Sequence, residues 1–198
     1  YCLRLQSETT ISEKKIKEMS ESGELSKFKV IHLATHGLTV PEFPELSSIV
    51  LSQFNNSKAI EDGYLRISEI ADLKTKADFV NLSACETGLG KLYAGEGVVG
   101  LSQAFLLAGA NGLSVSLWNV ADKSTAVFMT GMYQLVEQKG MTYSEAINEM
   151  KKQFITGKSS LLPDTNERGM QVVKNTEPDL VNTSHPFYWA PFVYYGKN

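Results

Sequence analysis

The chain has 198 residues and carries 19 lysines and arginines against 22 aspartates and glutamates, a formal net charge of −3 at pH 7. This length suffices for one domain with a sizeable core, and the slight negative charge offers no basic surface for nucleic acid or an anionic membrane. No apolar run approaches the roughly 20 residues of a membrane-spanning helix. We therefore expect no direct contact with nucleic acid or membrane.

A short helix is predicted near the N-terminus, in "SEKKIKEMSESG" (residues 12–23). Thr10, followed three residues later by Glu13, has the pattern of a capping box, and Gly23 ends the helix. The apolar, β-branched run "FKVIHLA" (28–34) then predicts a strand.

The middle of the chain predicts one irregular stretch and two more strands. Residues 37–63 fit no single element, so we expect a long loop with a small hairpin around "SIVLSQ". The runs "ADFVNLSA" (77–84) and "GLSVSLW" (112–118) have the length and composition of strands. A helix is predicted between them, over residues 97–110.

Two consecutive helices are predicted in the second half of the chain. One covers residues 122–138, where apolar residues share a face, and Gly140 closes it. Thr142 and Glu145 form a capping box that begins the other. We expect this last helix to bury Ala146, Ile147, Met150 and Phe154.

Strands that alternate with helices predict an α/β fold with a mostly parallel sheet flanked by helices on both faces, a three-layer sandwich. Strand runs that are apolar on both faces suit such a sheet. The aromatic stretch 187–196 predicts a terminal strand, with Pro191 at a kink or edge position. Residues 157–186 form a long polar loop, a length typical of functional or disordered segments.

One histidine and one cysteine each follow a predicted strand. His36 comes two residues after the first run, and Cys85 directly follows the second. In open α/β sheets, functional residues lie at the carboxyl ends of the strands. If the two strands are parallel neighbours, the imidazole and the thiol face one crevice. Gly37 and Gly88 let the backbone turn there and offer N–H groups to a substrate oxygen.

Other patterns favour structural roles. His32 lies inside the strand pattern, which favours a core histidine. The spacing of His32 and His36 matches a zinc-binding pair on a helix, but the first lies in a strand and no HExxH glutamate lies between them. The glycines of "AGEGVVG" follow no strand closely enough for a dinucleotide-binding loop. We therefore expect neither a metal nor a nucleotide cofactor.

The separation of His36 and Cys85 is 85 − 36 = 49 residues, and caspases place their histidine roughly 50 residues before the cysteine. The chain resembles the CHAT family, caspase-like peptidase domains that often follow tetratricopeptide repeats and also resemble separase. "VIHLATHG" is similar to the family's histidine box and "FVNLSACETGLG" to its cysteine box. The resemblance continues through "AGEGVVGLSQAFLLAGA", "SLWNVADKSTAVFM" and "HPFYWAPFVYYG".

The resemblance covers nearly the whole chain. It implies one CHAT domain over residues 1–198, taken from a longer protein. The family's usual opening, a strand and a helix before the region of residue 10, is not recognisable in the sequence. We interpret this as a trimmed or processed N-terminus.

The resemblance also implies a chemistry. Cys85 is the expected nucleophile and His36 the proton-transfer group of a cysteine endopeptidase. The backbone N–H groups of Gly37 and Cys85 are the expected oxyanion hole, and no cofactor is required. By similarity to separase, Asp122 is expected to bind a basic side chain before the scissile bond; the alternative is that it only caps the following helix. Glu86, beside the nucleophile, is a second candidate for substrate binding.

The expected partners are a protein substrate and a regulatory region outside this chain, for which tetratricopeptide repeats are one candidate. Cys2 and Cys85 form neither a CxxC pair nor a disulfide framework, which favours a reducing compartment and a cytoplasmic location. Two alternatives stay open at this point. One is a caspase-like scaffold that binds without cleaving, and the other is a different hydrolase or acyl transferase that uses the same dyad.

Overall fold

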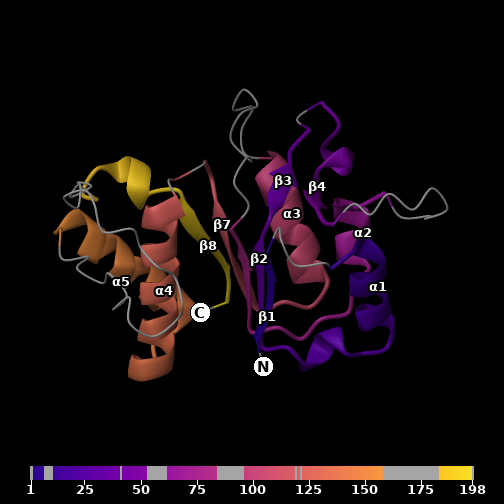
Figure 1. Ribbon diagram of the computed structural model, residues 1–198, viewed down its shortest axis with the longest axis horizontal. Helices are drawn as coiled ribbons and strands as arrows, with labels where there is room; N and C mark the ends of the chain where they lie inside the picture. Colours follow the sequence, from indigo (N-terminus) through magenta and orange to yellow (C-terminus); the bar gives the residue numbers. More distant parts are fainter. Residues whose placement is uncertain are drawn as a thin grey trace, which may run out of the picture. The chain divides into compact units, whose positions relative to one another are not determined.

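The computed structural model describes residues 2–6, 11–40, 42–52, 62–83, 96–118, 120, 122–157 and 183–197. It contains two compact units, the first formed by residues 1–119 with 192–198 and the second by residues 120–191. Figure 1 shows the elements of both. Among the described residues, no helix is long and apolar enough to cross a membrane.

A five-stranded sheet organises the first unit, in the order β1-β2-β6-β7-β8. Neighbours are parallel up to β7, and β8 closes the sheet antiparallel to β7. Its strands are β1 (Cys2–Gln6), β2 (Val30–Ala34), β6 (Phe79–Leu82), β7 (Gly112–Ser116) and β8 (Phe192–Gly196). The predicted α/β fold with a mostly parallel sheet flanked by helices is confirmed.

Helices α1 (Glu13–Glu21), α2 (Ile67–Ala71) and α3 (Glu96–Leu107) lie on the same side of this sheet (Figure 1). Period-2 alternation along the strands sends every second side chain toward them. Strand and helix side chains there form one buried cluster, which includes Ile31, Leu33, Val80, Leu82, Leu113 and Val115 from the strands and Ile16, Met19, Ile70, Leu101 and Phe105 from the helices. Burial of this cluster holds the first unit together.

The opposite face of the sheet is polar at its centre. His32, Asn81 and Ser114 are register partners on β2, β6 and β7, so their side chains lie in one row. All three are buried. The expectation of strands apolar on both faces is therefore wrong for this row. The sequence shows hydrophobic runs because β2 and β6 each carry one polar side chain in this row, and β7 carries only small serines, Ser114 and Ser116.

The first helix begins at a different cap from the one predicted. Ser12 is the N-cap of α1, and its hydroxyl accepts a hydrogen bond from the N–H of Lys15. A capping box of Thr10 with Glu13 is wrong, because Glu13 is the first helical residue and its buried carboxylate bonds elsewhere. Gly23 follows the helix with φ +75°, a conformation that glycine adopts at little cost.

A small antiparallel sheet, β3-β4-β5, replaces much of the long loop predicted over residues 37–63. It consists of β3 (His36–Leu38), β4 (Ser48–Val50) and β5 (Tyr64–Arg66), and the 3-10 helix η2 (Pro44–Leu46) lies between β3 and β4. A further 3-10 turn, η1 (Leu25–Lys27), precedes β2. The predicted hairpin around "SIVLSQ" is confirmed, but β3 and β5 are too short to leave a period-2 signal.

The two ends of the five-stranded sheet also differ from expectation. β1 occupies Cys2–Gln6 and pairs in parallel with β2, so a strand does precede the region of residue 10. Strand β8 begins only after Pro191, because a proline cannot donate to the ladder. The Tyr194 ring stacks on Phe79 at 6.5 Å, and its hydroxyl leaves no room for a Cβ on Gly112.

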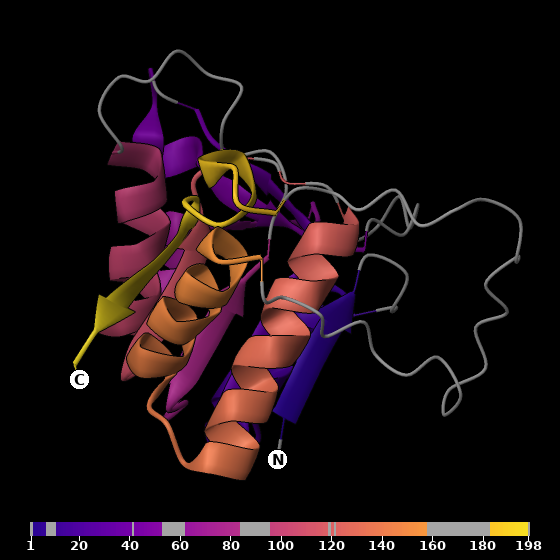
Figure 2. The same cartoon turned by 90° about the vertical axis from the view of Figure 1, so that its left-hand side faces the viewer.

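The second unit contains α4 (Asp122–Lys139), α5 (Tyr143–Ile155) and the 3-10 helix η3 (Pro186–Tyr188). Figure 2 shows α4 and α5 side by side, where Phe128 and Phe154 meet edge to face at 5.3 Å. The capping box of Thr142 and Glu145 is confirmed, as are the four residues predicted to be buried by α5. Of the predicted loop 157–186, residues 158–182 lie outside the described residues.

Candidate active site

The carboxyl ends of β2 and β6 lie side by side. These strands are parallel neighbours, with Val30 opposite Phe79 and Leu33 opposite Leu82. One residue further on, the N–H of Ser83 donates to the carbonyl of Leu33 at 2.9 Å. The ladder thus continues to the point where both strands end. The sequence predicts that His36 and Cys85 follow the strands at this edge of the sheet.

His36 is the first residue of β3, one residue after the linker Thr35, and its side chain is exposed. The Thr35 hydroxyl donates to the backbone carbonyl of Val50, which ties the exit of β2 to β4. His36 and Val50 are register partners, and the buried Gly37 lies opposite Ile49. The imidazole is therefore held at the start of a paired strand rather than on a free loop.

Two adjacent serines at the far end of this hairpin are both fully buried, but only the first has a side chain hydrogen-bonded to another described residue. Ser47 Oγ accepts a hydrogen bond from the N–H of Val40 at 3.0 Å, and its carbonyl accepts one from Ile67 at 3.2 Å. Ser48 Oγ is buried with no hydrogen-bond partner among the residues that the structure describes. Ser47 thus closes the turn that brings β4 back beside β3.

The other predicted site residues fall in three places. Cys85 and Glu86 lie outside the described residues, so their expected roles stay predictions. Asp122 is the first residue of α4, in the second unit. His32 is 8% exposed inside β2, in agreement with the core role predicted for it. In the described part of the chain, no group of three or more potential ligands is placed to hold a metal ion.

A family model, the CHAT domain, matches residues 3–197 of the chain. The chain belongs to the CHAT domain family. CHAT domains are caspase-like, and members of the family are often peptidases.

Two curated relatives are similar to most of this chain. Tetratricopeptide repeat protein 28 of Mus musculus is 25% identical over 165 residues, and its Homo sapiens counterpart is 25% identical over the same length. Each match covers 82% of this chain and 6% of the relative. The chain therefore spans only a small part of the length of these relatives.

An ion-pair network that the sequence did not reveal supports the base of the small sheet. Lys17 on α1 bonds Glu13 and also Glu69 on α2, the latter at 2.7 Å. The second oxygen of Glu13, which is 2% exposed, accepts the N–H of Gly63 at 2.9 Å. The second oxygen of Glu69 accepts the N–H of Arg66 at 2.8 Å. The network connects two helices to both ends of β5.

The network also shifts the pKa of Lys17 and of Glu69. Burial opposes the charge of Lys17, but hydrogen bonds to Glu13 and Glu69 outweigh it and raise the pKa of Lys17 above its ordinary value. Burial likewise opposes the charge of Glu69, and the hydrogen bonds from Lys17 and Arg66 outweigh it and lower the pKa of Glu69. Both shifts indicate that the charged, paired state is the favoured one.

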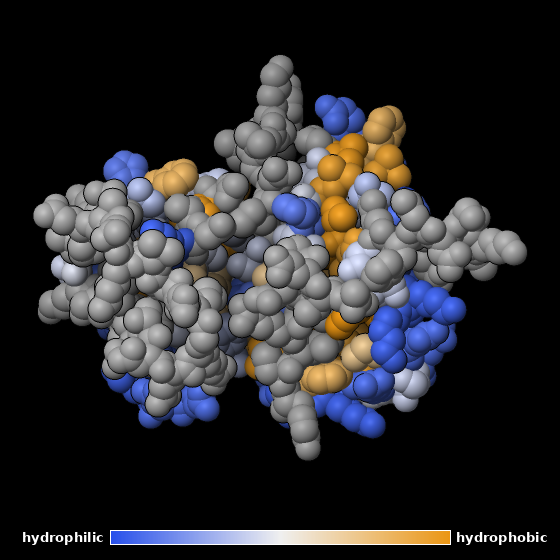
Figure 3. All heavy atoms as spheres, in the orientation of Figure 1, coloured by the Kyte–Doolittle hydropathy of each residue, from blue (hydrophilic) through white to orange (hydrophobic). Residues whose placement is uncertain are grey.

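An apolar surface lies on the same hairpin as His36. Leu38 is 44% exposed, Phe43 57% and Leu46 46%, and we call these three residues the hairpin surface. Figure 3 shows it as orange spheres beside blue ones, at the upper right, where β3 and β4 lie in Figure 1. Exposed apolar side chains that gather in one place mark an interaction site more often than scattered ones do.

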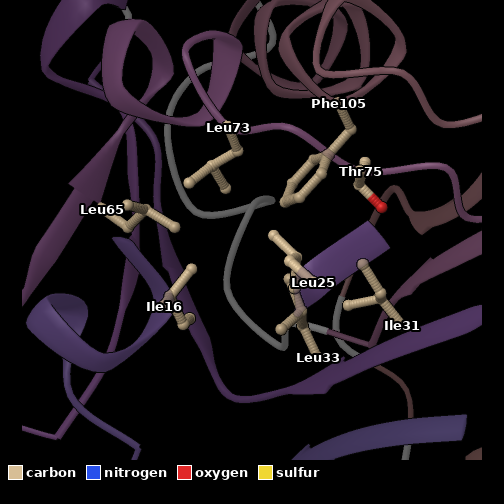
Figure 4. Close-up of a pocket in the computed structure, with 8 residues that line it drawn as sticks. All are labelled: Ile16, Leu25, Ile31, Leu33, Leu65, Leu73, Thr75 and Phe105. Carbon is tan, nitrogen blue, oxygen red and sulfur yellow. The ribbon is translucent and has the colours of Figure 1, made fainter. Parts of the chain in front are cut away.

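A cavity in the core of the first unit is too small to be a binding site. Its volume is about 20 Å³, roughly that of one water molecule. Figure 4 shows the side chains that surround it: Ile16, Leu25, Ile31, Leu33, Leu65, Leu73, Thr75 and Phe105. The Thr75 hydroxyl accepts the N–H of Ala77 at 3.1 Å. The cavity is a packing defect between apolar side chains.

Proposed function

We propose that this CHAT domain is a cysteine endopeptidase in which His36 and Cys85 form the catalytic dyad. The observation that carries the proposal is the parallel pairing of β2 with β6 up to their carboxyl ends. His36 lies two residues after the last residue of β2, and Cys85 lies three residues after the last residue of β6. Both candidate residues thus follow the ends of neighbouring strands.

The register supports the pairing of these two residues in particular. Leu33 lies opposite Leu82, an offset of 82 − 33 = 49 positions. The separation of His36 and Cys85 is also 85 − 36 = 49 positions. Neighbouring strands lie about 4.8 Å apart. His36 and Cys85 each lie three positions beyond one of the register partners Leu33 and Leu82 on such neighbouring strands, which supports their assignment as a pair.

The chemistry requires a thiolate and a proton donor. A free thiol has a pKa of about 8.5, so only a few per cent is thiolate at neutral pH, and a neighbouring imidazole raises that fraction. The Cys85 sulfur attacks the peptide carbonyl carbon, and His36 gives a proton to the leaving amine. Water then hydrolyses the thioester, which releases the new carboxylate and restores the thiol.

The charge that develops on the carbonyl oxygen needs donors that are already in place. We assign this role to the N–H groups of Gly37 and Cys85. Gly37 directly follows His36 in the β3–β4 ladder, which fixes its backbone. The loss of one such donor typically costs on the order of 3 kcal/mol of transition-state stabilisation.

Substrate choice and control form part of the same proposal. We assign the recognition of a basic side chain before the scissile bond to Asp122, with Glu86 as the second candidate. Regulation is assigned to regions outside this chain, and the tetratricopeptide repeats in the names of the two curated relatives support repeats as the partner. Cleavage of a specific protein under such control agrees with a reducing, cytoplasmic setting.

Variants of the dyad test the proposal. The chain and its Cys85→Ala and His36→Ala variants are incubated with a proteome-derived peptide library, and new termini are identified by mass spectrometry. We expect cleavage that both substitutions abolish and that Cys2→Ala leaves unchanged. Circular dichroism should show that each variant keeps its fold.

A labelling experiment tests the reactivity of the dyad without a substrate. Iodoacetamide should label Cys85 faster than Cys2 in the folded protein, and His36→Ala should slow the labelling of Cys85 alone. Equal labelling rates together with an uncleaved library would favour the non-cleaving scaffold. Cleavage that survives Cys85→Ala would refute the peptidase mechanism.

A further inference from the structure

We infer that the hairpin surface, formed by Leu38, Phe43 and Leu46, is the docking surface for an extended, basic and apolar segment of the polypeptide substrate. The inference rests on the proposed function and adds to it the chemistry of the substrate. This surface lies on the same hairpin as His36.

His36 and Leu38 project from the same side of β3. The burial along this strand alternates, with His36 and Leu38 exposed and Gly37 buried between them. Residues two apart in a strand are separated by about 6.6 Å. The side chains of an extended peptide repeat at the same interval. A substrate residue next to His36 is therefore followed, two positions along the peptide, by one that lies over Leu38.

The backbone of β3 favours an extended partner. β4 is the partner of β3 in the order β3-β4-β5, and among the described strands β3 forms an edge of this sheet. An edge strand offers unpaired N–H and C=O groups to a further strand, and a peptide that joins an edge is a common mode of recognition. Main-chain pairing would supply affinity, and the exposed leucine would supply preference.

The charged residues beside the hairpin surface indicate the charge of the substrate segment that binds there. Glu42 and Glu45 are exposed beside Phe43 and Leu46. Residues 36–48 contain these two glutamates and no lysine or arginine. Arg66, two strands away in the same sheet, is paired with Asp62. The hairpin is thus acidic around an apolar centre, which complements a segment in which Lys or Arg flanks an apolar residue.

A binding experiment with three labelled peptides tests the inference. The probes are fluorescein-labelled decapeptides in a Gly/Ser background, with a central Leu between two Lys, with Ser in place of that Leu, or with Glu in place of the Lys residues. The Cys85→Ala protein is used, so that binding is read without cleavage. By fluorescence anisotropy, we expect the Leu/Lys peptide to bind about tenfold more tightly than either of the other two.

Substitutions in the protein locate the site. Leu38→Ser combined with Leu46→Ser should remove the preference for the Leu/Lys peptide, whereas Leu107→Ser should keep it. Leu107 is the matched control, because it is 77% exposed at the end of α3, outside the hairpin. Higher salt should reduce the preference of Lys over Glu, since surface charges are screened. Equal binding of the three peptides, or an unchanged preference in the double variant, would overturn the inference.

The outcomes separate this inference from the proposed function. Preferential binding of the Leu/Lys peptide that needs Leu38 and Leu46 supports the docking surface whether or not the peptide is cut. Cleavage by the wild-type chain that depends on Cys85 but is equally efficient in the Leu38→Ser, Leu46→Ser variant would support the peptidase and refute the docking surface.

Discussion

Replacing Lys17 by methionine tests the ion-pair network under the small sheet. Methionine keeps most of the length and the apolar stem of lysine but removes the ammonium group that bridges Glu13 and Glu69. The carboxylate of Glu13 would then keep the N–H of Gly63 as its neutral partner while its side chain stays 3% exposed. A buried carboxylate without its cation is costly, so the variant should lose stability.

The contact distances and the exposure of Lys17 determine how much free energy of unfolding should be lost. At the observed contact distances, each of the two pairs attracts by about 6 kcal/mol for an effective dielectric constant near 20. Most of this attraction offsets the desolvation of the charges. The removal of one member of a buried pair costs about 3–5 kcal/mol. Because the Lys17 side chain is 32% exposed, we expect a loss at or just below the lower end of that range, about 2–3 kcal/mol in the free energy of unfolding.

Urea denaturation followed by circular dichroism measures this loss, and the same helix supplies a control. Lys14 and Glu18 form an i,i+4 pair at 3.9 Å with side chains 66% and 53% exposed. Lys14→Met should therefore change the free energy of unfolding by no more than about 0.5 kcal/mol. Combining Lys17→Met with Glu13→Gln should recover part of the loss, because the buried charge is then absent. Equal midpoints for Lys17→Met and Lys14→Met would refute the reasoning.

Three further predictions follow from individual contacts. Ser47→Ala should lower the free energy of unfolding by about 1–2 kcal/mol because a backbone N–H loses its acceptor, whereas Ser48→Ala should be neutral or stabilising because its hydroxyl has no hydrogen bond to lose within the part of the chain that the structure describes; urea midpoints of the two variants compare them directly. Glu69 has a lowered pKa, so its contribution to stability is present above its unfolded pKa and is lost as the pH falls through the folded value; Glu69→Gln should flatten the stability profile below about pH 4.5 in denaturation series at several pH values. If Asp122 recognises a basic side chain, Asp122→Asn should reduce kcat/KM for Arg peptides about tenfold and spare neutral ones, whereas a role limited to the helix terminus predicts little change on either peptide.

Periodic and capping signals predicted much of the fold. The strands at β2, β6 and β7 and the buried face of α5 follow from hydrophobic runs and from the pair Thr142 and Glu145, because these signals are local. The role of Glu13 was missed for a tertiary reason, whereas the N-cap Ser12 bonds the N–H of Lys15 only three positions away. Glu13 bonds Lys17 and Gly63, and the second contact is 50 positions away in the chain, so no local pattern encodes it.

The candidate site was predictable only in part. The position of His36 at the end of β2 follows from the apolar run before it, but its place at the start of a paired strand does not, because β3 is three residues long. The hairpin surface was also not predicted from the sequence. "PEFPEL" is typical of a loop, and nothing in the order of its residues shows that Phe43 and Leu46 stay exposed. The assignment of Cys85 and Glu86 depends on the family resemblance.

The path of the chain through the first unit has a consequence for synthesis and for protein engineering. Residues 120–191 are inserted between β7 and β8, yet Ser116 and Phe192 are opposite one another in the ladder. The sheet cannot be completed during synthesis until residues 192–196 have left the ribosome. Strand β7 therefore lacks its partner β8 while residues 120–191 are being synthesised. Because the two ladder positions are adjacent, a turn of a few residues could join them and yield a minimal version of the first unit.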